Sequence, residues 1–587
     1  MHRGAAEQEL IAAARASRDD DPDPLTRAET DALLQRVDTR LAGASAAALD
    51  ELGERFGSEI AFGTAGLRGL IGAGTSRMNR RAVARTTAGL CAYLVRSVPD
   101  AQRRGVCIGF DARHGSRDFA DEAASVARGA GFEVHMFDGV VPTPLLAFAV
   151  LDRAACAGIM ITASHNPAEY NGYKVYLSDG AQLSSPHDRE IQREIAGVVS
   201  VLQLPRVATG RRSLSDAAER YVSAIAGQVQ RPACPLPLRV AYTALHGVGE
   251  LLARRVFERI GALDVHSVAE QATPDPDFPT VRFPNPEEKG ALDRLLELGE
   301  RVRADLALAN DPDADRLALC ARDAGGKLAA LSGNELGVLL ADHLLSRAPH
   351  DGKNLIVTTI VSTPLVERVA QAHGARCERT LTGFKWIVPR ALELERTEGL
   401  RFVLGFEEAI GYCVGQHVRD KDGIGAAAHA LHMAELHARA GRTLHAALEA
   451  IYRRHGFCQS SQVSFTQPGP RGVAELAAAL ARVRAQPPLS LAGIPVAHVR
   501  DLLHGTASAA AGGGGRASLP PSDVLSLELE GCHRITLRPS GTEPKLKIYL
   551  DLWAELEPTT PLALARARAS ALATQLVAAL VEALGLR

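Results

Sequence analysis

The stretch Ala157-Gly158-Ile159-Met160-Ile161-Thr162-Ala163-Ser164-His165-Asn166-Pro167 joins an apolar run to a polar loop. The run 157–161 has the length and composition of a buried strand. The loop that follows consists of small, polar and turn-forming residues, so Ser164 is predicted to be exposed for chemistry at the end of that strand. The alternative is an ordinary turn or helix cap, in which Ser, Asn and Pro are also common.

Other short apolar runs along the chain alternate with longer amphipathic segments. Strands are predicted at 106–110, 306–309, 355–359 and 402–404, and helices at 291–302 and 427–440. Strands that alternate with helices indicate α/β layers with mostly parallel sheets. In such folds ligands bind at loops that follow the strands, which is where the polar loops of this chain occur.

The pattern changes at both ends of the chain. Residues 1–50 are predicted to be helical, with a break at Asp19-Asp20-Asp21-Pro22-Asp23-Pro24. Near the C-terminus, strands at 534–537 and 546–550 precede a helix at 561–584, which indicates a smaller α+β domain. The glycine-containing tract 507–515 is predicted to be a surface loop. Length and composition predict four domains, at 1–210, 211–328, 329–450 and 451–587.

Composition limits the classes of function. The 587 residues include 66 basic and 68 acidic side chains, for a net charge of −2, which gives no reason to expect a nucleic acid or a membrane as partner. The nine cysteines lack a C-x-x-C pair, which fits a reducing compartment better than a disulfide framework or a zinc site. No signal peptide and no membrane-spanning stretch are expected, so a cytoplasmic location is predicted.

The loop Asn310-Asp311-Pro312-Asp313-Ala314-Asp315-Arg316 follows a predicted strand and carries three alternating carboxylates. Their oxygens are of the kind that a hard divalent cation prefers, and three carboxylates leave ligand positions for phosphate oxygens, which suits Mg²⁺. An EF-hand is excluded, because its glycine and glutamate positions are occupied by Arg316 and Arg322. The alternative is a solvated acidic turn. If the loop holds a metal, Arg316 is placed to bind a phosphoryl group.

Two further loops have the chemistry of ligand sites. Glu407 and Glu408, in the segment 405–412, are suited to accept hydrogen bonds from sugar hydroxyls, although a surface turn is equally compatible with them. The segment Arg538-Pro539-Ser540-Gly541-Thr542-Glu543-Pro544-Lys545 combines Arg, hydroxyl groups and backbone N–H groups in a Gly-containing turn, which suits an anion site. A plain hairpin turn is equally compatible with it. Weaker signals of the same kind lie at 62–69, 111–114, 382–385 and 419–423.

Together these segments resemble the α-D-phosphohexomutase superfamily. The segments FGTAGLRG (62–69), TASHNP (162–167), DPDADR (311–316) and RPSGTEP (538–544) occur in that family's order. The resemblance runs from about residue 50 to residue 555 and is strongest to the phosphoglucomutase-2/phosphopentomutase-like branch. The segments that indicate this branch are 242–249, 274–280, 380–386 and 406–412.

The resemblance implies a fold and a set of roles. Members of the family have four domains around a central cleft, three of them related α/β mixed-sheet domains and the fourth a smaller C-terminal α+β domain. Ser164 matches the serine that carries the phosphoryl group, and with Asp311, Asp313 and Asp315 it matches the Mg²⁺ ligands. The remaining matches are basic residues near the transferring phosphate (Arg68, Lys174, Arg316), sugar contacts (Thr382, Gly383, Glu407, Lys421) and the loop for the phosphate that is not transferred (Arg538, Ser540, Gly541, Thr542).

The implied activity is a phosphosugar mutase that interconverts a hexose 1-phosphate and 6-phosphate, with glucose expected first, through a phosphoserine and glucose 1,6-bisphosphate as intermediate and activator. His165 and Lys174 are the candidates for moving the hydroxyl proton. Ala409 stands where many members have a serine that contacts the sugar, so this departure bears on hexose preference more than on catalysis. A phosphopentomutase, a glucose 1,6-bisphosphate synthase, a metal-dependent phosphatase and a non-catalytic sensor are the alternatives. Small sugar phosphates are the expected partners of a monomer or small homo-oligomer.

Overall fold

The computed structural model describes residues 2–38, 42–64, 66–229, 237–467, 469–507, 519–539, 545–557 and 559–586. The chain divides into two compact units. Unit 1 comprises Met1–Arg322, Lys327–Ala330 and Ile410–Leu436, and unit 2 comprises Asp323–Gly326, Leu331–Ala409 and His437–Arg587. The predicted loop at 507–515 lies outside the described residues, except for its first residue.

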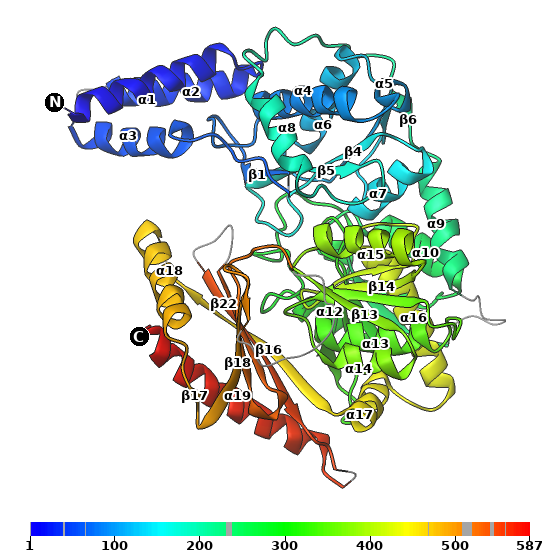
Figure 1. Cartoon of the computed structure of the whole chain (residues 1–587). Coiled ribbons are helices and arrows are strands. Elements are labelled where there is room, and N and C mark those ends of the chain that lie inside the picture. The colour runs from blue at the N-terminus through cyan, green and yellow to red at the C-terminus, as the bar shows by residue number, and fades with distance from the viewer. Residues whose placement is uncertain are drawn as a thin grey trace. The chain divides into compact units, whose positions relative to one another are not determined.

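Unit 1 begins with three helices, α1 (His2–Asp19), α2 (Pro24–Asp38) and α3 (Ala42–Phe56), which pack against one another (Figure 1). Apolar side chains from all three, among them Ala14, Leu33 and Leu52, form a small core of their own. The predicted break between the first two helices is present. Buried Asp21 accepts the Thr26 hydroxyl at 2.7 Å, so the acidic turn fixes the start of α2.

The first sheet of unit 1 has the order β1-β5-β4-β2-β3-β6. Strands β2, β3, β4 and β6 are parallel, whereas β5 runs antiparallel to both β4 and β1, so the sheet is mixed. The strands are β1 (Leu67–Leu70), β2 (Val106–Phe110), β3 (Val134–Met136), β4 (Ala157–Ile161), β5 (Tyr170–Leu177) and β6 (Arg212–Ser213).

Helices cover both faces of this sheet. On one face α4 (Arg80–Ser97), α6 (Ser116–Gly129) and α8 (His187–Ala196) bury a core that includes Leu90, Phe119 and Ile159. On the other face α7 (Thr143–Asp152) approaches so closely that a Cβ at Gly158 would lie 2.5 Å from a methyl carbon of Val150. A strand with buried neighbours on both faces reads as a continuous apolar run, which is why 106–110 and 157–161 are recognisable in the sequence.

The second sheet of unit 1 has the order β11-β10-β9-β7-β8, and α10 (Glu250–Ile260) and α12 (Asp293–Val302) pack against its strand β7. Its strands are β7 (Val240–Thr243), β8 (Val265–Ser267), β9 (Leu306–Ala309), β10 (Ala318–Arg322) and β11 (Leu328–Leu331). Unit 1 also includes β15 (Gly411–Val414) and most of α16 (Gly423–Arg439). This late segment joins the second sheet's loops through a bridge between Arg316 and Gly411.

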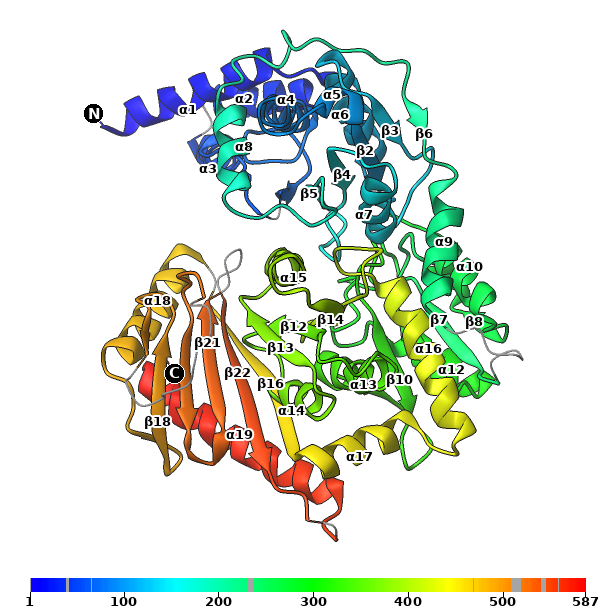
Figure 2. The same cartoon turned by 45° about the vertical axis from the view of Figure 1, so that its right-hand side comes forward.

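Unit 2 holds a parallel three-strand group, β13-β12-β14, and an antiparallel sheet (Figures 1 and 2). The parallel strands are β12 (Asn354–Thr359), β13 (Arg376–Thr380) and β14 (Arg401–Glu407), with helices α13 (Gly333–Leu345), α14 (Leu365–Ala372), α15 (Phe384–Glu398) and α17 (Leu444–His455). The antiparallel sheet follows the order β16-β22-β21-β20-β18-β17 and is the predicted α+β domain. Its main elements are β16 (Phe457–Thr466), β17 (Ser490–Leu491), β18 (Ile494–Asp501), β20 (Leu525–Leu529), β21 (Arg534–Pro539), β22 (Lys545–Ala554), α18 (Gly469–Ala485) and α19 (Leu562–Leu584).

Helix α19 is long and apolar enough to cross a membrane by length and composition. The prediction that no stretch reaches that length is therefore wrong for this helix. Its Leu576, Leu580 and Leu584 are fully buried and belong to the core between the antiparallel sheet and α18. Only 22% of its apolar window is buried, so core packing accounts for the face of α19 that carries these leucines and not for the whole apolar composition.

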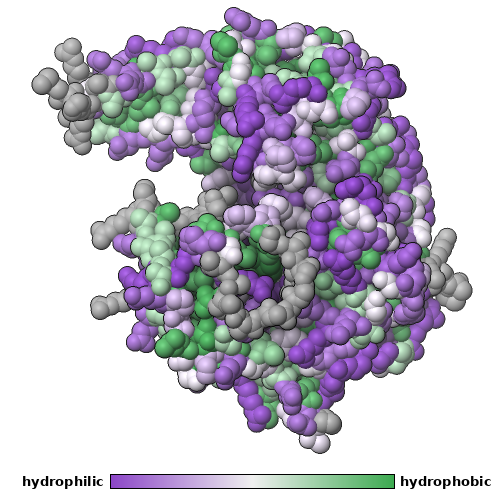
Figure 3. Space-filling model, viewed as in Figure 1, coloured by the Kyte–Doolittle hydropathy of each residue, from purple (hydrophilic) through white to green (hydrophobic). Residues whose placement is uncertain are grey.

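On the face seen in Figure 3, hydrophilic and hydrophobic residues are interspersed. The large apolar side chains that are exposed come from separate elements, for example Leu25 in α2, Val199 after α8 and Leu251 in α10. Single exposed apolar residues of this kind are normal for folded proteins.

A prediction concerns Asn79, which begins α4. Its side chain accepts the Ala82 N–H at 2.9 Å and donates to the carbonyl oxygens of Gly72 at 3.0 Å and Gly74 at 2.9 Å. We expect Asn79→Ala to lower the free energy of unfolding by about 2 kcal/mol, because two carbonyls lose their donor and the helix loses its cap. The exposed capping box of α13 is the comparison, and Ser332→Ala should cost about 1 kcal/mol. Urea denaturation measures both, and an equal cost would contradict the role of the two carbonyl contacts.

Candidate active site

Ser164 lies directly beyond β4, in a loop with an unusual backbone. It is buried, with 4% of its surface exposed, so the prediction of an exposed serine is wrong in this structure. Its φ is 54°, in the left-handed region that serine rarely adopts. The hydroxyl donates to Asp311 Oδ2 at 3.1 Å, and Oγ also lies 3.1 Å from Nδ1 of His165. The serine and the acidic loop, which are far apart in the sequence, are therefore in direct contact within unit 1.

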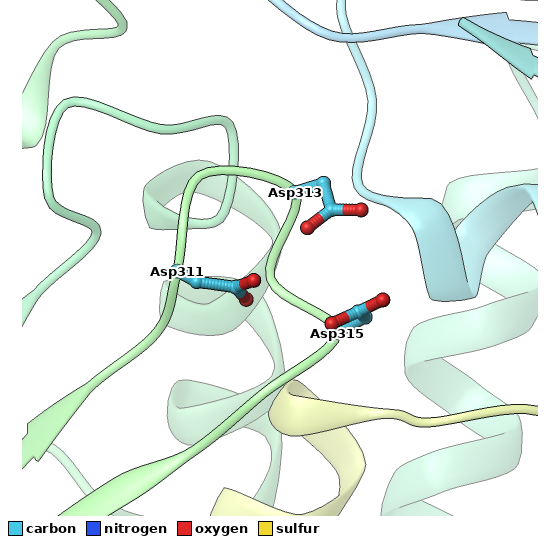
Figure 4. A group of neighbouring side chains, drawn as sticks. All are labelled: Asp311, Asp313 and Asp315. Carbon is cyan, nitrogen blue, oxygen red and sulfur yellow. The ribbon is translucent and has the colours of Figure 1, made fainter. Parts of the chain in front are cut away.

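The acidic loop follows β9 and holds three buried carboxylates. Ligand oxygens of Asp311, Asp313 and Asp315 all lie within 4.8 Å of one another, and Figure 4 shows them turned toward a common space. The Oδ1 atoms of Asp313 and Asp315 are buried and make no hydrogen bond with any described residue. Buried carboxylate oxygens without donors are costly unless a cation pairs with them. The residues present therefore fit a hard divalent cation.

Neighbouring charges act differently on Asp311 and Asp313. Burial, with the negative charges of Asp315 and Asp313, raises the pKa of Asp311 well above its usual value. Burial also opposes ionisation of Asp313, but the ammonium of Lys174 and hydrogen bonds from Lys174 and Thr143 outweigh it and lower the pKa of Asp313. Burial disfavours the charged form of Lys174 in turn, and the carboxylates of Asp313 and Asp315 overcome it and raise its pKa.

The loop keeps its shape because other segments bind its backbone. The Thr143 N–H donates to the carbonyl of Asp313 at 2.9 Å, and the Val248 N–H donates to that of Pro312 at 2.8 Å. Gly247 permits the second contact, since a Cβ there would lie 2.3 Å from the Cα of Pro312. The glycine-containing segment 242–249, noted in the sequence as a branch signature, thus supports the acidic loop.

Four cationic side chains surround this loop and the serine. Lys174 Nζ, from β5, lies 2.7 Å from Asp313 Oδ2 and 3.1 Å from Asp315 Oδ2. Lys421 Nζ lies 3.4 Å from the same Asp315 oxygen. The Arg316 backbone N–H donates to Asp311 Oδ1 at 3.0 Å, and its guanidinium lies 3.4 Å from Glu287. Arg68 is solvent-exposed and donates to Asn166 Oδ1 at 3.2 Å in the serine loop.

His165 contacts both the serine and the acids. Its Nδ1 lies 3.8 Å from Asp311 Oδ2 in addition to the contact with Ser164. Loss of solvent around the ring, with the positive charges of Arg316 and Arg68, lowers the pKa of His165 well below its ordinary value. A neutral imidazole has one nitrogen free to accept a proton.

Two buried tyrosines hold the segment that carries Lys421. The Tyr176 hydroxyl donates to Asp420 Oδ2 and the Tyr221 hydroxyl to Asp422 Oδ1, both at 2.7 Å. The other oxygen of Asp420 accepts the Lys421 N–H at 2.7 Å. Burial raises the pKa of Asp422 to about 6, against the effect of its hydrogen bonds. These contacts bind a segment from late in the chain to a strand and a helix from its first half.

The other predicted site residues belong to unit 2. Thr382 has a buried hydroxyl without a hydrogen-bond partner among the described residues, and Gly383 begins α15 with φ of 112°, which requires glycine. Glu407 ends β14 and is buried, while Glu408 accepts the hydroxyls of Thr359 and Ser362 at 3.2 and 3.4 Å. Arg538 lies on β21. Ser540, Gly541 and Thr542 lie outside the described residues.

Several residues at the site were not singled out from the sequence. Thr143 donates its hydroxyl to Asp313 Oδ2 at 2.6 Å, yet it reads as an ordinary helix start between two prolines. Tyr176 resembles a core tyrosine on an apolar strand. Arg113 contacts the serine loop, and the loop 111–114 carried only a weak signal. The only sequence signal for Arg113 was that it is a charged residue in a loop that follows a predicted strand.

Comparison with known proteins places the chain in a family. Residues 59–200, 219–326 and 332–455 match phosphoglucomutase/phosphomannomutase α/β/α domains I, II and III. A probable phosphoribomutase of Schizosaccharomyces pombe is 38% identical over 84% of this chain and 86% of its own length. A phosphopentomutase of Homo sapiens is 34% identical (86% and 87%), and a phosphoglucomutase of Staphylococcus haemolyticus is 34% identical (85% and 91%).

Solved structures share the fold. A phosphoglucomutase/phosphomannomutase family protein of Burkholderia thailandensis superposes with a TM-score of 0.67 at 19% identity, covering 90% of this chain and 98% of that one. A putative phosphomannomutase of Thermus thermophilus gives a TM-score of 0.64 at 21% identity, over 89% and 98%. The predicted fold class, three α/β domains followed by a smaller α+β domain, is confirmed. The chain belongs to the phosphoglucomutase/phosphomannomutase family of phosphosugar mutases, as its resemblance to the α-D-phosphohexomutase superfamily indicates.

Proposed function

We propose that this enzyme interconverts a hexose 1-phosphate and the corresponding 6-phosphate, with glucose as the preferred sugar and Ser164 as the phosphoryl carrier. The observation that carries the proposal is the contact between the Ser164 hydroxyl and Asp311 at 3.1 Å, inside a cluster of three buried acids. A non-catalytic sensor gives no reason to hold a serine hydroxyl against such a cluster, and a phosphatase gives no reason for the separate anion loop expected at 538–545.

In the proposed reaction the P–O bond of phosphorylated Ser164 breaks as a new P–O bond forms to a sugar hydroxyl. The hydroxyl's proton is transferred overall to Ser164 Oγ, and the sugar becomes a bisphosphate. His165 is the proposed proton carrier, because its Nδ1 lies 3.1 Å from Oγ whereas Lys174 Nζ is bound by two carboxylates. Lys174, Arg68 and Arg316 neutralise the charge of the transferring group, on which this chemistry depends. The second phosphate then returns to Ser164 by the reverse steps.

We propose Mg²⁺ as the cation, held by Asp311, Asp313, Asp315 and an oxygen on Ser164. Oxygen ligands in this number suit Mg²⁺, which is commonly bound by a few carboxylates together with phosphate oxygens. When bound, the ion would act as a Lewis acid on phosphoryl oxygens.

Sugar and second-phosphate contacts are assigned by the family match. Thr382, Gly383, Glu407 and Lys421 are proposed to bind sugar hydroxyls. Arg538, Ser540, Gly541 and Thr542 are proposed to hold the phosphate that is not transferred. The unpaired hydroxyl of Thr382 and the positive φ of Gly383 support a ligand-binding turn at 382–383. Glucose 1,6-bisphosphate is the proposed intermediate and activator.

A pentose phosphate is the second candidate substrate. The related proteins carry both kinds of name, phosphoglucomutase and phosphopentomutase or phosphoribomutase. Ala409 lacks the hydroxyl that many family members place at this position, which favours the pentose alternative.

We also propose a cytoplasmic enzyme, monomeric or a small homo-oligomer, with domains at 1–210, 211–328, 329–450 and 451–587. Cys91, Cys107, Cys156 and Cys458 are buried free thiols, which fits a reducing compartment. Small sugar phosphates are the proposed partners, without a role for nucleic acid or membrane.

The first prediction here concerns the phosphoryl carrier. Ser164→Ala should lower kcat by about 10³-fold or more, because no other group takes over the covalent step. Intact-mass spectrometry of the wild type incubated with glucose 1,6-bisphosphate should show an added mass of roughly 80 daltons, which Ser164→Ala lacks. Ser223→Ala, on the exposed face of α9 (Ala217–Gln228), is the control. Near-normal turnover by Ser164→Ala would refute the assignment.

The second prediction concerns the metal. Asp313→Asn should raise the Mg²⁺ concentration needed for half-maximal activity about 10- to 100-fold, and added Mg²⁺ should restore activity only in part. Asp100→Asn, an exposed acid far from the triad in sequence, should titrate with Mg²⁺ like the wild type. An Asp313→Asn enzyme with an unaltered response to Mg²⁺ and EDTA would count against the metal site.

The third prediction concerns the sugar. With Mg²⁺ and a trace of glucose 1,6-bisphosphate, kcat/KM for glucose 1-phosphate should exceed that for ribose 1-phosphate by about tenfold or more. The loss of one carbon group from a substrate typically lowers kcat/KM by about this factor. The opposite ratio would assign the enzyme to pentose phosphates. Release of free phosphate without isomer formation would exclude a mutase.

A further inference from the structure

The backbone at Ser164 is held in a conformation that serine disfavours. A φ of 54° costs a non-glycine residue about 1–3 kcal/mol and persists only where the surroundings fix it from several sides. Among the described residues, the Ser164 side chain contacts His165 and Asp311, which orient the hydroxyl, while the Ser164 N–H donates to the Thr162 hydroxyl at 2.9 Å and the Ile71 N–H donates to the carbonyl of Glu169 at 2.8 Å. A further group holds the other carbonyls of 164–170.

That group is Arg113, in the turn between β2 and α6. Its guanidinium donates to the carbonyl oxygens of Ser164 at 2.6 Å, Pro167 at 2.7 Å and Tyr170 at 3.2 Å, and also to that of Asn166. The side chain is only 1% exposed. A planar guanidinium with five N–H donors is the one side chain that can serve several carbonyls in fixed directions. Arg113 thus binds four carbonyls spread along the serine loop, in addition to the contact in which Thr162 Oγ1 accepts the Ser164 N–H at 2.9 Å.

Arg113 is itself held by its neighbours in the same turn. Its Nε lies 3.4 Å from Asp111 Oδ2, and Asp111 Oδ1 accepts both the Arg113 N–H at 3.0 Å and the Ser116 hydroxyl at 2.6 Å. Asn171, at the start of β5, donates to the His114 carbonyl at 2.9 Å. The turn 111–116 and the loop 164–171 are therefore joined through buried polar contacts.

The segment 274–280 supports Arg113 from the other sheet of unit 1. The guanidinium carbon of Arg113 lies 5.0 Å from the ring centroid of Phe278, a cation–π distance. Phe278 is buried and has a φ of 46°, so its placement over Arg113 also requires a disfavoured backbone. Next to it, Asp277 Oδ1 lies 2.7 Å from Nε2 of His114.

The same segment continues to the acidic loop. The Asp275 N–H donates to the carbonyl of His246 at 2.9 Å, and His246 precedes Gly247 and Val248, which pack against Pro312. A continuous set of contacts therefore runs from the carbonyls of the serine loop through Arg113 and Phe278 to the backbone of the acidic loop. Nothing in the proposed chemistry uses Arg113 or Phe278 directly.

We propose that Arg113 and Phe278 are positioning residues that set the location of Ser164 relative to the three acids. The inference rests on the proposed role of Ser164 as phosphoryl carrier. A displacement of about 1 Å in a reacting atom costs about 10²-fold in rate, whereas binding of the sugar phosphate by other residues is unaffected. Loss of either positioning residue should therefore lower kcat with little change in KM.

The decisive variants are Phe278→Leu, which keeps Arg113 but removes the ring, and Arg113→Lys, which keeps the charge but cannot serve the same carbonyls. We expect kcat with glucose 1-phosphate to fall about 10- to 100-fold, with KM within about twofold of the wild type. The rate at which glucose 1,6-bisphosphate phosphorylates Ser164, followed by intact mass, should fall in parallel. In that step the phosphoryl group moves from the sugar to Oγ, and the serine proton moves to the released sugar oxygen.

Two control variants separate positioning from general stability. Phe132→Leu removes a buried ring from the core of the first sheet, and it should lower the unfolding temperature as Phe278→Leu does while kcat is retained. Arg117→Lys alters an arginine of α6 whose guanidinium carbon lies 5.3 Å from the ring centroid of Phe110, and it should keep both kcat and the phosphorylation rate.

Phosphorylation of Phe278→Leu at the wild-type rate, or a kcat equal to that of Phe132→Leu, would overturn the inference. A change confined to KM would also overturn it. If circular dichroism shows that Arg113→Lys does not fold, the kcat, KM and phosphorylation rate of Phe278→Leu alone test the inference. Failure of the proposed function is distinguishable, because in that case wild-type Ser164 takes up no phosphoryl group and Ser164→Ala retains turnover.

Discussion

The burial of three carboxylates within 4.8 Å of one another is the constraint on which unit 1 depends. Moving a single unpaired charge out of water costs several kcal/mol, and like charges at this distance add to that cost. The protein offsets it in part with the ammonium groups of Lys174 and Lys421 and the hydroxyl of Thr143. Two oxygens, on Asp313 and Asp315, remain without a donor from the described residues. A site that is incompletely neutralised by its own side chains is one that favours binding of a cation. The hydroxyl of Ser164, the proposed phosphoryl carrier, lies directly beside it.

Holding these acids in place determines much of the surrounding backbone. The acidic loop has a left-handed residue at Ala314, and so do the segments that meet it, at Leu245, His246 and Ile410. Each of these backbones is disfavoured alone, and each is fixed by contacts with another segment, such as the Leu317 N–H donating to the carbonyl of Ile410 at 3.0 Å. The strain therefore falls on the loops that surround the acids and the serine, while the strands beneath them are regular. Rigid sheets allow the loops to be held in conformations that an isolated peptide does not populate.

The sequence predicted the loops but not their supports, for a physical reason. Ser164 and the three acids are recognisable because small, polar and acidic residues that cluster at strand ends are not needed for packing. Thr143, Tyr176 and Arg113 act through contacts with residues that are distant in the chain, and locally they look like an ordinary helix start, core aromatic and turn residue. Strand positions such as 106–110 and 157–161 were predictable since continuous apolar runs occur where both faces are buried. The inclusion of Ile410–Leu436 in unit 1 was not predictable from the sequence. It depends on the hydrogen bonds Tyr176–Asp420 and Tyr221–Asp422, which join residues far apart in the chain and leave no local sequence pattern.

This division of the chain bears on specificity. Ser164, the acids, Lys174 and Lys421 belong to unit 1, whereas Thr382, Gly383, Glu407 and Arg538 belong to unit 2. The proposed phosphoryl carrier and most of the proposed sugar contacts therefore belong to separate compact units, and the chain crosses from one to the other between Ala409 and Ile410, directly after the paired acids. The contacts described above that fix Ser164 all lie within unit 1, so substitutions at the proposed sugar contacts of unit 2 leave them undisturbed.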